Sequence, residues 1–291
     1  MEWGAAGIDR DPGGGGRALG QEEGSEGMKG LSQRVLNQRF LLRMLSIVVV
    51  LGLWELAGIR HIVFAFPRFS DTMVALYKLV ISGVLPKAFL LSFRSLLIGF
   101  AISAVAGIAW GLLMSSFGFL NWLSRPYIII LYGAPTAALV PIMTLTFGIG
   151  LGVEAAFVVL MAMPIIILNT YSGVKNVDQR LLEMGRAFLA NRRQVFIKIL
   201  LPDAMPMVMA GLRLGFSLGF VGMILAELMI SPIGLGDLML RYQAQFRFDK
   251  LFAVIAAILV GAALLLSLLK RLENRLLRWK FEGSMGNRGE V

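Results

Sequence analysis

Long apolar stretches, separated by short polar segments, recur along the chain. A helix needs about 20 mostly apolar residues to cross a lipid bilayer. Six stretches approach or reach this length: residues 44–62, 96–114, two within 126–174, 206–230 and 251–269. The sequence GIGLG at residues 148–152 predicts a tight turn that divides the long stretch into two helices. The pattern therefore predicts an all-α integral membrane protein with six transmembrane helices, and disfavours a soluble protein with buried core helices.

The composition supports a membrane protein. Of the 291 residues, 57% are hydrophobic and 16% are charged, and the mean hydropathy is +0.75. Soluble domains carry charge on roughly a quarter of their residues. The net charge of +10 does not indicate nucleic-acid binding, because the basic residues lie at the ends of apolar stretches. The chain has no cysteine and one histidine, His61, so we expect no disulfide, no metal site and no other cofactor.

The distribution of lysine and arginine predicts the orientation. Cytoplasmic segments of membrane proteins are enriched in these residues. With the N-terminus inside, the inner segments 1–43, 115–125, 173–206 and 270–291 hold 19 basic residues, and the outer segments hold seven. We therefore expect both termini and residues 173–206 to lie in the cytoplasm.

The N-terminal segment differs from the rest of the chain. Residues 1–28 contain PGGGG and GQEEGSEG and show no apolar periodicity, so they cannot bury enough surface to fold. We expect a disordered tail or a start-site artefact, with Met28 as an alternative start. A basic segment over 29–43, a membrane domain over 44–270 and a basic tail over 271–291 complete the chain. Within the membrane domain, residues 71–82 have helical spacing and predict a short helix on the outer surface.

Two predicted spans carry small residues at every fourth position. The strip in the second span is Gly99, Ser103, Gly107 and Gly111, and the strip in the fifth is Gly211, Gly215 and Gly219. Small residues at this spacing let another helix approach closely. We expect tight helix packing, either within one subunit or across a dimer.

Prolines and one carboxylate interrupt the apolar stretches. Pro135 and Pro141 predict kinks that line a pathway or act as local bends. Glu227 lies deep in the fifth span and is a functional candidate, since intramembrane charges are costly. The alternative is that Glu227 hydrogen-bonds the backbone of the SPIGLGD segment that follows it. Glu154, at the outer turn, is expected to be solvated.

The charged segment between residues 178 and 203 is unlike its surroundings. Asp178 can cap a helix start, and an apolar ridge follows at Leu181, Leu182, Gly185, Phe188 and Leu189. A second short helix is predicted over residues 193–200, ending at Pro202. Two short helices with an apolar ridge and a basic rim predict a docking element for a partner protein. A solvated loop helix is the alternative.

This segment resembles the EAA loop of permeases from ATP-binding cassette (ABC) importers. That pattern reads EAA, three residues, G, nine residues, I, one residue, LP. Glu183, Met184 and Gly185 take the EAA places, and Leu189 takes the place of the glycine. The remaining matches are Ile199, Leu201 and Pro202. The flanking sequences PTAALVPIMTLTFGIG, PIIILNTYSGVKNVD and ILAELMISPIGLGDLM are similar to the branch that handles nitrate, sulfonates and taurine.

The resemblance implies a type I ABC-importer permease with six helices, in the plasma membrane of a bacterium. It would act as a homodimer and form the translocation path for a small anion. Residues 173–206, including Arg186, would be the coupling loop for cytoplasmic ATPase subunits. A solute-binding protein would deliver the solute from outside. A self-sufficient secondary transporter or channel is the alternative, but no inverted repeat or charged pathway is visible. No phosphate-binding loop or catalytic set is present, so we expect no enzymatic activity in this chain.

Overall fold

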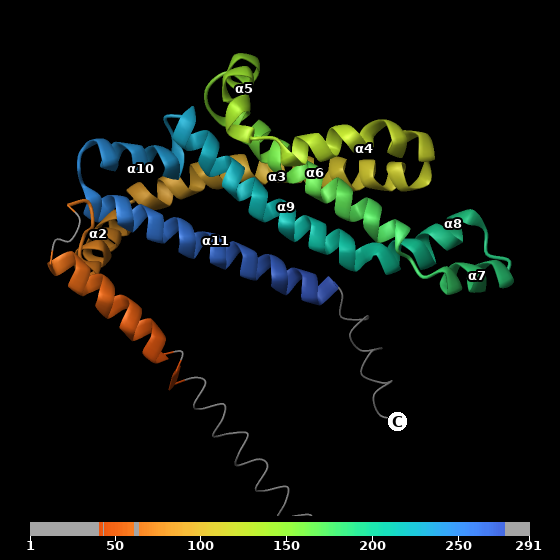
Figure 1. Ribbon diagram of the computed structural model, residues 1–291, viewed down its shortest axis with the longest axis horizontal. Coiled ribbons are helices and arrows are strands. Elements are labelled where there is room, and N and C mark those ends of the chain that lie inside the picture. Colours follow the sequence, from red (N-terminus) through yellow and green to blue (C-terminus); the bar gives the residue numbers. More distant parts are fainter. Residues whose placement is uncertain (1–40, 43, 61–63, 277–291) are drawn as a thin grey trace, which may run out of the picture. The chain divides into compact units, whose positions relative to one another are not determined.

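The computed structural model describes residues 41–42, 44–60 and 64–276 (Figure 1). Predictions for residues 1–28, for most of 29–43, for His61 and for the tail beyond 276 lie outside this range. The chain divides into two compact units, residues 1–69 and 70–291. In the first unit, an apolar helix runs over Met44–Ile59, and Trp54 Nε1 donates a hydrogen bond to Pro67 O at 3.1 Å.

In the second unit, the described residues form helices joined by short turns. Its four long helices are α3 (Val84–Ser116), α6 (Leu151–Lys175), α9 (Leu201–Met229) and α11 (Phe248–Leu276). The shorter elements are α2 (Phe69–Ile81), α4 (Gly118–Gly133), η1 (Thr136–Leu139), α5 (Val140–Phe147), α7 (Gln179–Ala187), α8 (Arg192–Val195), η2 (Phe196–Leu200) and α10 (Gly234–Ala244). The helix predicted over residues 71–82 is confirmed as α2.

The all-helical membrane fold is confirmed, but the count of six spans is not. Four described helices are long and apolar enough to cross a membrane, and a fifth crossing exists if α4 and the η1–α5 segment count as one. These two parts meet at an angle of 100°. The bend falls at Ala134 and Pro135, because the residue before a proline favours extended backbone and Ala134 has ψ 143°. The helix Met44–Ile59 is shorter than the predicted first span.

The two small-residue strips are used within one subunit. A Cβ atom added to Gly99 would lie 2.5 Å from Val158 Cβ, and one added to Gly219 would lie 3.0 Å from Val158 Cγ1. Two turns further along α6, Ile166 lies between Gly107 on α3 and Gly215 on α9. A Cβ atom added to Gly107 would lie 2.8 Å from Ile166 Cγ2, and one added to Gly215 would lie 2.6 Å from Ile166 Cγ1. Gly111 contacts Thr170, and Gly211 contacts Asn169. Helix α6 is therefore held between the glycine strips of α3 and α9.

A hydroxyl completes the strip on α3. Ser103 is fully buried, and its Oγ donates to Gly99 O at 2.7 Å. The hydroxyl is satisfied by its own helix and leaves a small surface toward α6. Serine can therefore take the place of glycine in a strip of this kind.

We expect Gly99→Ala to destabilise the membrane domain. The new Cβ would lie 2.6 Å from Ala155 O, a backbone atom that cannot rotate away. Overpacking a close-packed core costs about 1–3 kcal/mol. The measurement is the melting temperature of the purified chain in detergent. It is obtained from the fraction that remains monodisperse in size-exclusion chromatography after heating to a series of temperatures.

The matched control is Gly118→Ala, where nothing lies within 4 Å of the new Cβ. It should melt at or slightly above the temperature of the unmodified chain. Equal melting temperatures for the two variants would show that the close approach of α3 and α6 is not required.

Candidate functional site

The connection between α6 and α9 is a folded element with capped helices. Asp178 Oδ1 accepts a hydrogen bond from Arg180 N at 2.9 Å and caps α7. Asn191 and Gln194 form a capping box at α8, with reciprocal side-chain bonds of 2.8 Å and 2.9 Å. These caps satisfy backbone N–H groups that helix starts leave without partners. The loop therefore has a defined shape (Figure 1).

The second short helix does not end at Pro202, as the sequence pattern suggested. Helix α8 continues through a π-helical segment, η2, directly into α9. Pro202 lies in the first turn of α9, and Leu201 is the first residue of that helix. The prediction was wrong because the π-helical segment precedes Pro202, with Leu201 N donating to Phe196 O, and the helical backbone continues past the proline.

Gly185 faces the inside of the loop. It is buried, and a Cβ placed on it would lie 2.6 Å from Ile199 Cδ1. The glycine lets α7 lie close to η2. Gly185 is therefore not an exposed part of the apolar ridge, and its role in coupling stays a prediction.

The exposed apolar surface of the loop lies at its tip. Phe188 is 80% exposed, Leu189 is 91% exposed and Met184 is half exposed. The charged side chains of Glu183 and Arg186 are also exposed nearby on α7. A large apolar tip with charges around it is typical of a surface that another protein covers.

Leu189 has an unusual backbone conformation. Its φ is 54°, in the left-handed region that favours glycine. Leu189 N donates to Arg186 O at 2.9 Å, and Ala190 N donates to Gly185 O at 3.0 Å. This is the Schellman arrangement, in which glycine usually takes the place of Leu189. The EAA pattern has glycine at this position, and a glycine would adopt the positive φ without strain, whereas Leu189 does not.

The turn between α10 and α11 repeats this feature. Phe246 has φ 56° and is 72% exposed. Phe246 N donates to Gln243 O at 3.0 Å, and Arg247 N donates to Tyr242 O at 2.9 Å. Leu189 and Phe246 are the two residues other than glycine with positive φ in the described ranges. Strained backbone of this kind is concentrated at functional sites, and sequence patterns did not identify Phe246.

Glu227 caps α10. The side chain is 1% exposed, and its Oε2 accepts a hydrogen bond from Gly236 N at 2.8 Å. Ser92 Oγ, from α3, accepts from Leu235 N at 3.0 Å. A buried helix start needs such acceptors, and its dipole favours a negative group. Of the two interpretations of Glu227, the structure thus shows the one in which its side chain accepts a hydrogen bond from the backbone of the SPIGLGD segment.

Glu154 belongs to the same buried region, contrary to the expected solvated position. It is 1% exposed, and Ser231 Oγ donates a hydrogen bond to its Oε1. Glu154, Glu227 and Ser92 thus tie the α9–α10 connection to α6, α9 and α3. Ser92, in α3, and Ser231, in the connection after α9, were not identified from sequence, because a single serine carries no spacing signal.

Glycines make room for this cap. Gly234 has φ 93°, and a Cβ on Gly236 would lie 2.6 Å from Glu227 Cβ. The glycines of the IGLGD sequence therefore let the backbone at the start of α10 lie close to the Glu227 carboxylate. Pro135 and Pro141 lie elsewhere, at the bend between α4 and α5. Among the described residues, no group of three or more acidic, histidine or cysteine side chains could hold a metal ion.

The structure is an all-helical membrane domain with a capped loop between α6 and α9. The family model for the binding-protein-dependent transport system inner membrane component matches residues 103–278, and the chain belongs to this family. It is the transmembrane subunit of an ABC importer, and the ATPase of this family is a separate chain.

Curated relatives cover most of the chain. It is 28% identical to the putative aliphatic sulfonates transport permease protein SsuC of Bacillus subtilis, over 81% of this chain and 87% of the relative. It is 30% identical to the taurine transport system permease protein TauC of Escherichia coli, over 69% and 70%. It is 32% identical to the formylaminopyrimidine transport permease protein ThiX of Halalkalibacterium halodurans, over 63% and 73%.

Solved structures show the same fold. The MetNI methionine ABC transporter in an inward-facing conformation matches 69% of this chain and 95% of its own chain, with a TM-score of 0.53 and 21% identity. An amino acid ABC transporter with histidines matches 71% and 96%, with a TM-score of 0.54 and 17% identity.

We expect Leu189→Gly to stabilise the loop. Releasing a non-glycine residue from the left-handed region gains about 1–2 kcal/mol, and the added flexibility of glycine in the unfolded chain costs about 0.5–1 kcal/mol. Hydrogen exchange at the Ala190 amide should slow by up to about tenfold, since 1.4 kcal/mol corresponds to a factor of ten. In the control, Ala187→Gly within α7, exchange should become faster. Faster exchange at the Ala190 amide in Leu189→Gly would contradict the conclusion that Leu189 is strained.

We expect Glu227→Leu to loosen the start of α10. The substitution leaves the buried Gly236 N–H without its acceptor, which costs about 1–3 kcal/mol. Amide exchange at Gly236 should rise by about fivefold or more. Glu227→Gln keeps an acceptor oxygen and should exchange far more slowly than Glu227→Leu. Asp237→Asn, at an exposed ion pair with Arg241, should leave Gly236 unchanged. Equal exchange in both Glu227 variants would contradict the cap.

Proposed function

We propose that this chain forms the translocation path for a small organic or inorganic anion, of the sulfonate, taurine or nitrate class. The family establishes an importer permease, and the names of two relatives carry the class of solute: SsuC is named for aliphatic sulfonates and TauC for taurine. Pro135, Pro141 and the bent α4–α5 region are proposed to line part of the path. Glu227, which caps α10, is proposed to hold an element at its gate.

We propose that the α7–α8 loop docks on the cytoplasmic ATPase. The single observation that carries this proposal is the apolar tip of Phe188 and Leu189, exposed on a loop that caps on both helices hold in shape. Arg186, Arg192 and Arg193 provide exposed positive charge on the same loop. The excess of basic residues in segments 1–43, 173–206 and 270–291 supports cytoplasmic termini.

The solute-binding protein is proposed to dock on the opposite side, around the α10–α11 turn. Phe246 is exposed there and packs edge-on against Phe248, with ring centroids 6.2 Å apart. Arg241 and Arg247 are exposed beside it. Burial and the nearby Asp249 raise the pKa of Tyr242 above its usual value, so Tyr242 is neutral at physiological pH. The turn therefore offers an apolar centre surrounded by the ion pairs Arg241–Asp237 and Arg247–Asp249.

A second copy of the chain is proposed to complete the path. The glycine strips on α3 and α9 are occupied by α6 within one subunit, so the dimer contact must use other surfaces. Helix α4 has one buried residue, Ile128, among 16. Its exposed side chains include Phe119, Trp122 and Tyr127. This face is the proposed contact, since α4 has few neighbours in its own subunit.

Two matched variants separate the two docking surfaces. We expect Phe188→Asp to lower recovery of the ATPase on the purified permease at least tenfold, because an unpaired charge buried at an interface costs several kcal/mol. We expect Phe246→Asp to leave ATPase recovery unchanged, and to remove the stimulation of ATP hydrolysis by the binding protein. The measurements are co-purification and ATP hydrolysis in proteoliposomes.

Both substitutions place aspartate at an exposed phenylalanine, so each controls for the other. Gly185→Asp is less informative, since Gly185 packs against Ile199 and the change would disturb the loop itself. Wild-type ATPase recovery and stimulation in Phe188→Asp would exclude the loop tip as the coupling surface. Loss of ATPase recovery in Phe246→Asp would contradict the proposal that the ATPase and the solute-binding protein dock on opposite sides of the membrane.

A further inference from the structure

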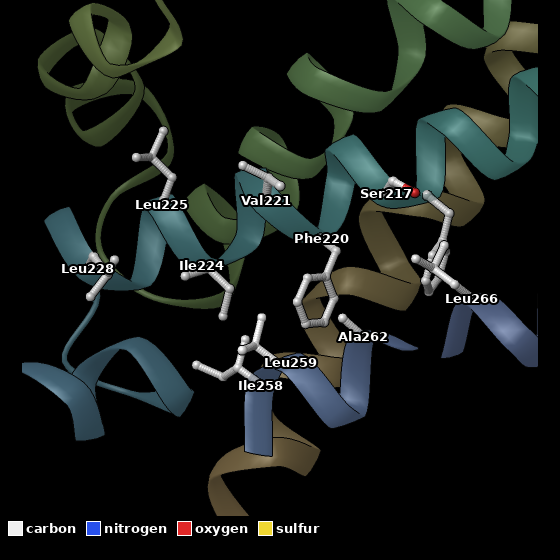
Figure 2. Close-up of a pocket in the computed structure, with 11 residues that line it drawn as sticks. Ser217, Phe220, Val221, Ile224, Leu225, Leu228, Ile258, Leu259, Ala262 and Leu266 are labelled. Atoms are coloured by element: carbon white, nitrogen blue, oxygen red, sulfur yellow. The ribbon is translucent and has the colours of Figure 1, made fainter. Parts of the chain in front are cut away.

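An apolar groove of about 520 Å³ runs between α9 and α11. Phe220, Ile224 and Leu228 line it from α9, and Leu259, Ala262 and Leu266 line it from α11 (Figure 2). The lining carries a single side-chain hydroxyl, that of Ser217, which donates to Arg213 O at 3.1 Å. No lining side chain offers a hydrogen bond to a polar solute, so a polar occupant would be desolvated without compensation. The groove is therefore suited to a hydrocarbon.

The groove is elongated along the helices. Phe216 and Leu228 lie at the two ends of its lining on α9, which corresponds to about 18 Å at 1.5 Å per residue. An extended hydrocarbon chain can lie along a groove of this shape.

Positive charge is gathered at one end of the groove. Arg213 lies one turn before Ser217, and Lys270 lies one turn after Leu266, both toward the end of α9 that joins α8. Arg213 Nη1 donates to Glu273 Oε2 at 2.8 Å and so joins the two helices there. The guanidinium group carries five N–H donors, and the Arg213 side chain is 39% exposed. At the opposite end the groove stops at Leu228 and Ile258, where the next turn of α11 holds the buried Val254.

We propose that this groove binds one acyl chain of a phospholipid with an anionic headgroup. The acyl chain lies along Phe220 and Ala262, and the headgroup phosphate is bound by Arg213 and Lys270. An apolar slot with cations at one end matches an anionic lipid, in which a negative group is joined to a hydrocarbon chain. Lysine and arginine attract anionic headgroups in this way at membrane surfaces. The bound lipid fills the space between α9 and α11 and stabilises their arrangement.

The test is native mass spectrometry of the full chain in detergent, with dioleoyl phosphatidylglycerol or dioleoyl phosphatidylcholine added at equal concentrations. The unmodified chain should retain phosphatidylglycerol at least several-fold more than phosphatidylcholine. Ala262→Phe fills the groove and should lower retention of phosphatidylglycerol at least several-fold. Ala263→Phe makes the same change on the exposed neighbouring position and should not. Equal retention in the two variants would overturn the proposal.

Lys270→Gln tests the headgroup site without filling the groove. It should reduce the preference for phosphatidylglycerol over phosphatidylcholine, whereas Lys250→Gln, at the other end of α11, should not. Lys270 is exposed, so this variant remains informative if Ala262→Phe fails to fold. An unchanged preference in Lys270→Gln would overturn the headgroup assignment. A change in oligomeric mass with unchanged lipid retention in Ala262→Phe would overturn the proposal and assign the groove to a helix of a second copy.

Discussion

The close approach of three helices around Val158 and Ile166 is the constraint on which the other features of the membrane domain depend. Inside a bilayer, lipid tails are as apolar as the side chains, so helices associate through close packing. Each of these two side chains lies between a glycine on α3 and a glycine on α9. This packing holds α3, α6 and α9 in one register. It thereby brings Ser92, Glu154 and Glu227 together at one end.

Both ends of this helical core are completed by local hydrogen bonds of the same kind. Helix ends leave N–H and C=O groups without partners, and a membrane interior offers no water to satisfy them. Carboxylate and hydroxyl oxygens accept from the start of α10, while Asp178 and Asn191 cap α7 and α8. The cap on α10 is buried and those on the loop are exposed. The cap on α10 therefore contributes more to stability, since an N–H group without an acceptor costs more free energy when it is buried away from water.

Sequence patterns predicted those features that depend on local spacing. The small-residue strips, the cap at Asp178 and the helix near residues 71–82 follow from three- and four-residue periodicity. The kink predicted at Pro135 is confirmed, but its angle of 100° was not predicted, because an apolar stretch has the same composition whether it is straight or sharply bent. Sequence patterns also placed Gly185 outside and Glu154 in solvent, since periodicity identifies a face of a helix but not its neighbour. Ile199, 14 positions away, and Ser231, 77 positions away, decide those two cases.

The continuity of α8, η2 and α9 has a mechanical consequence. Helical backbone runs without interruption from Arg192 to Met229, which is 38 residues or about 57 Å. It contains the π-helical segment Phe196–Leu200, which holds more residues per turn than an α-helix. Conversion of that segment to α-helix would shift the register by one residue, and so rotate α8 by about 100° relative to α9. The π-helical segment η2 thus sets the orientation of the α7–α8 loop relative to α9, whose other end leads to the cap of α10.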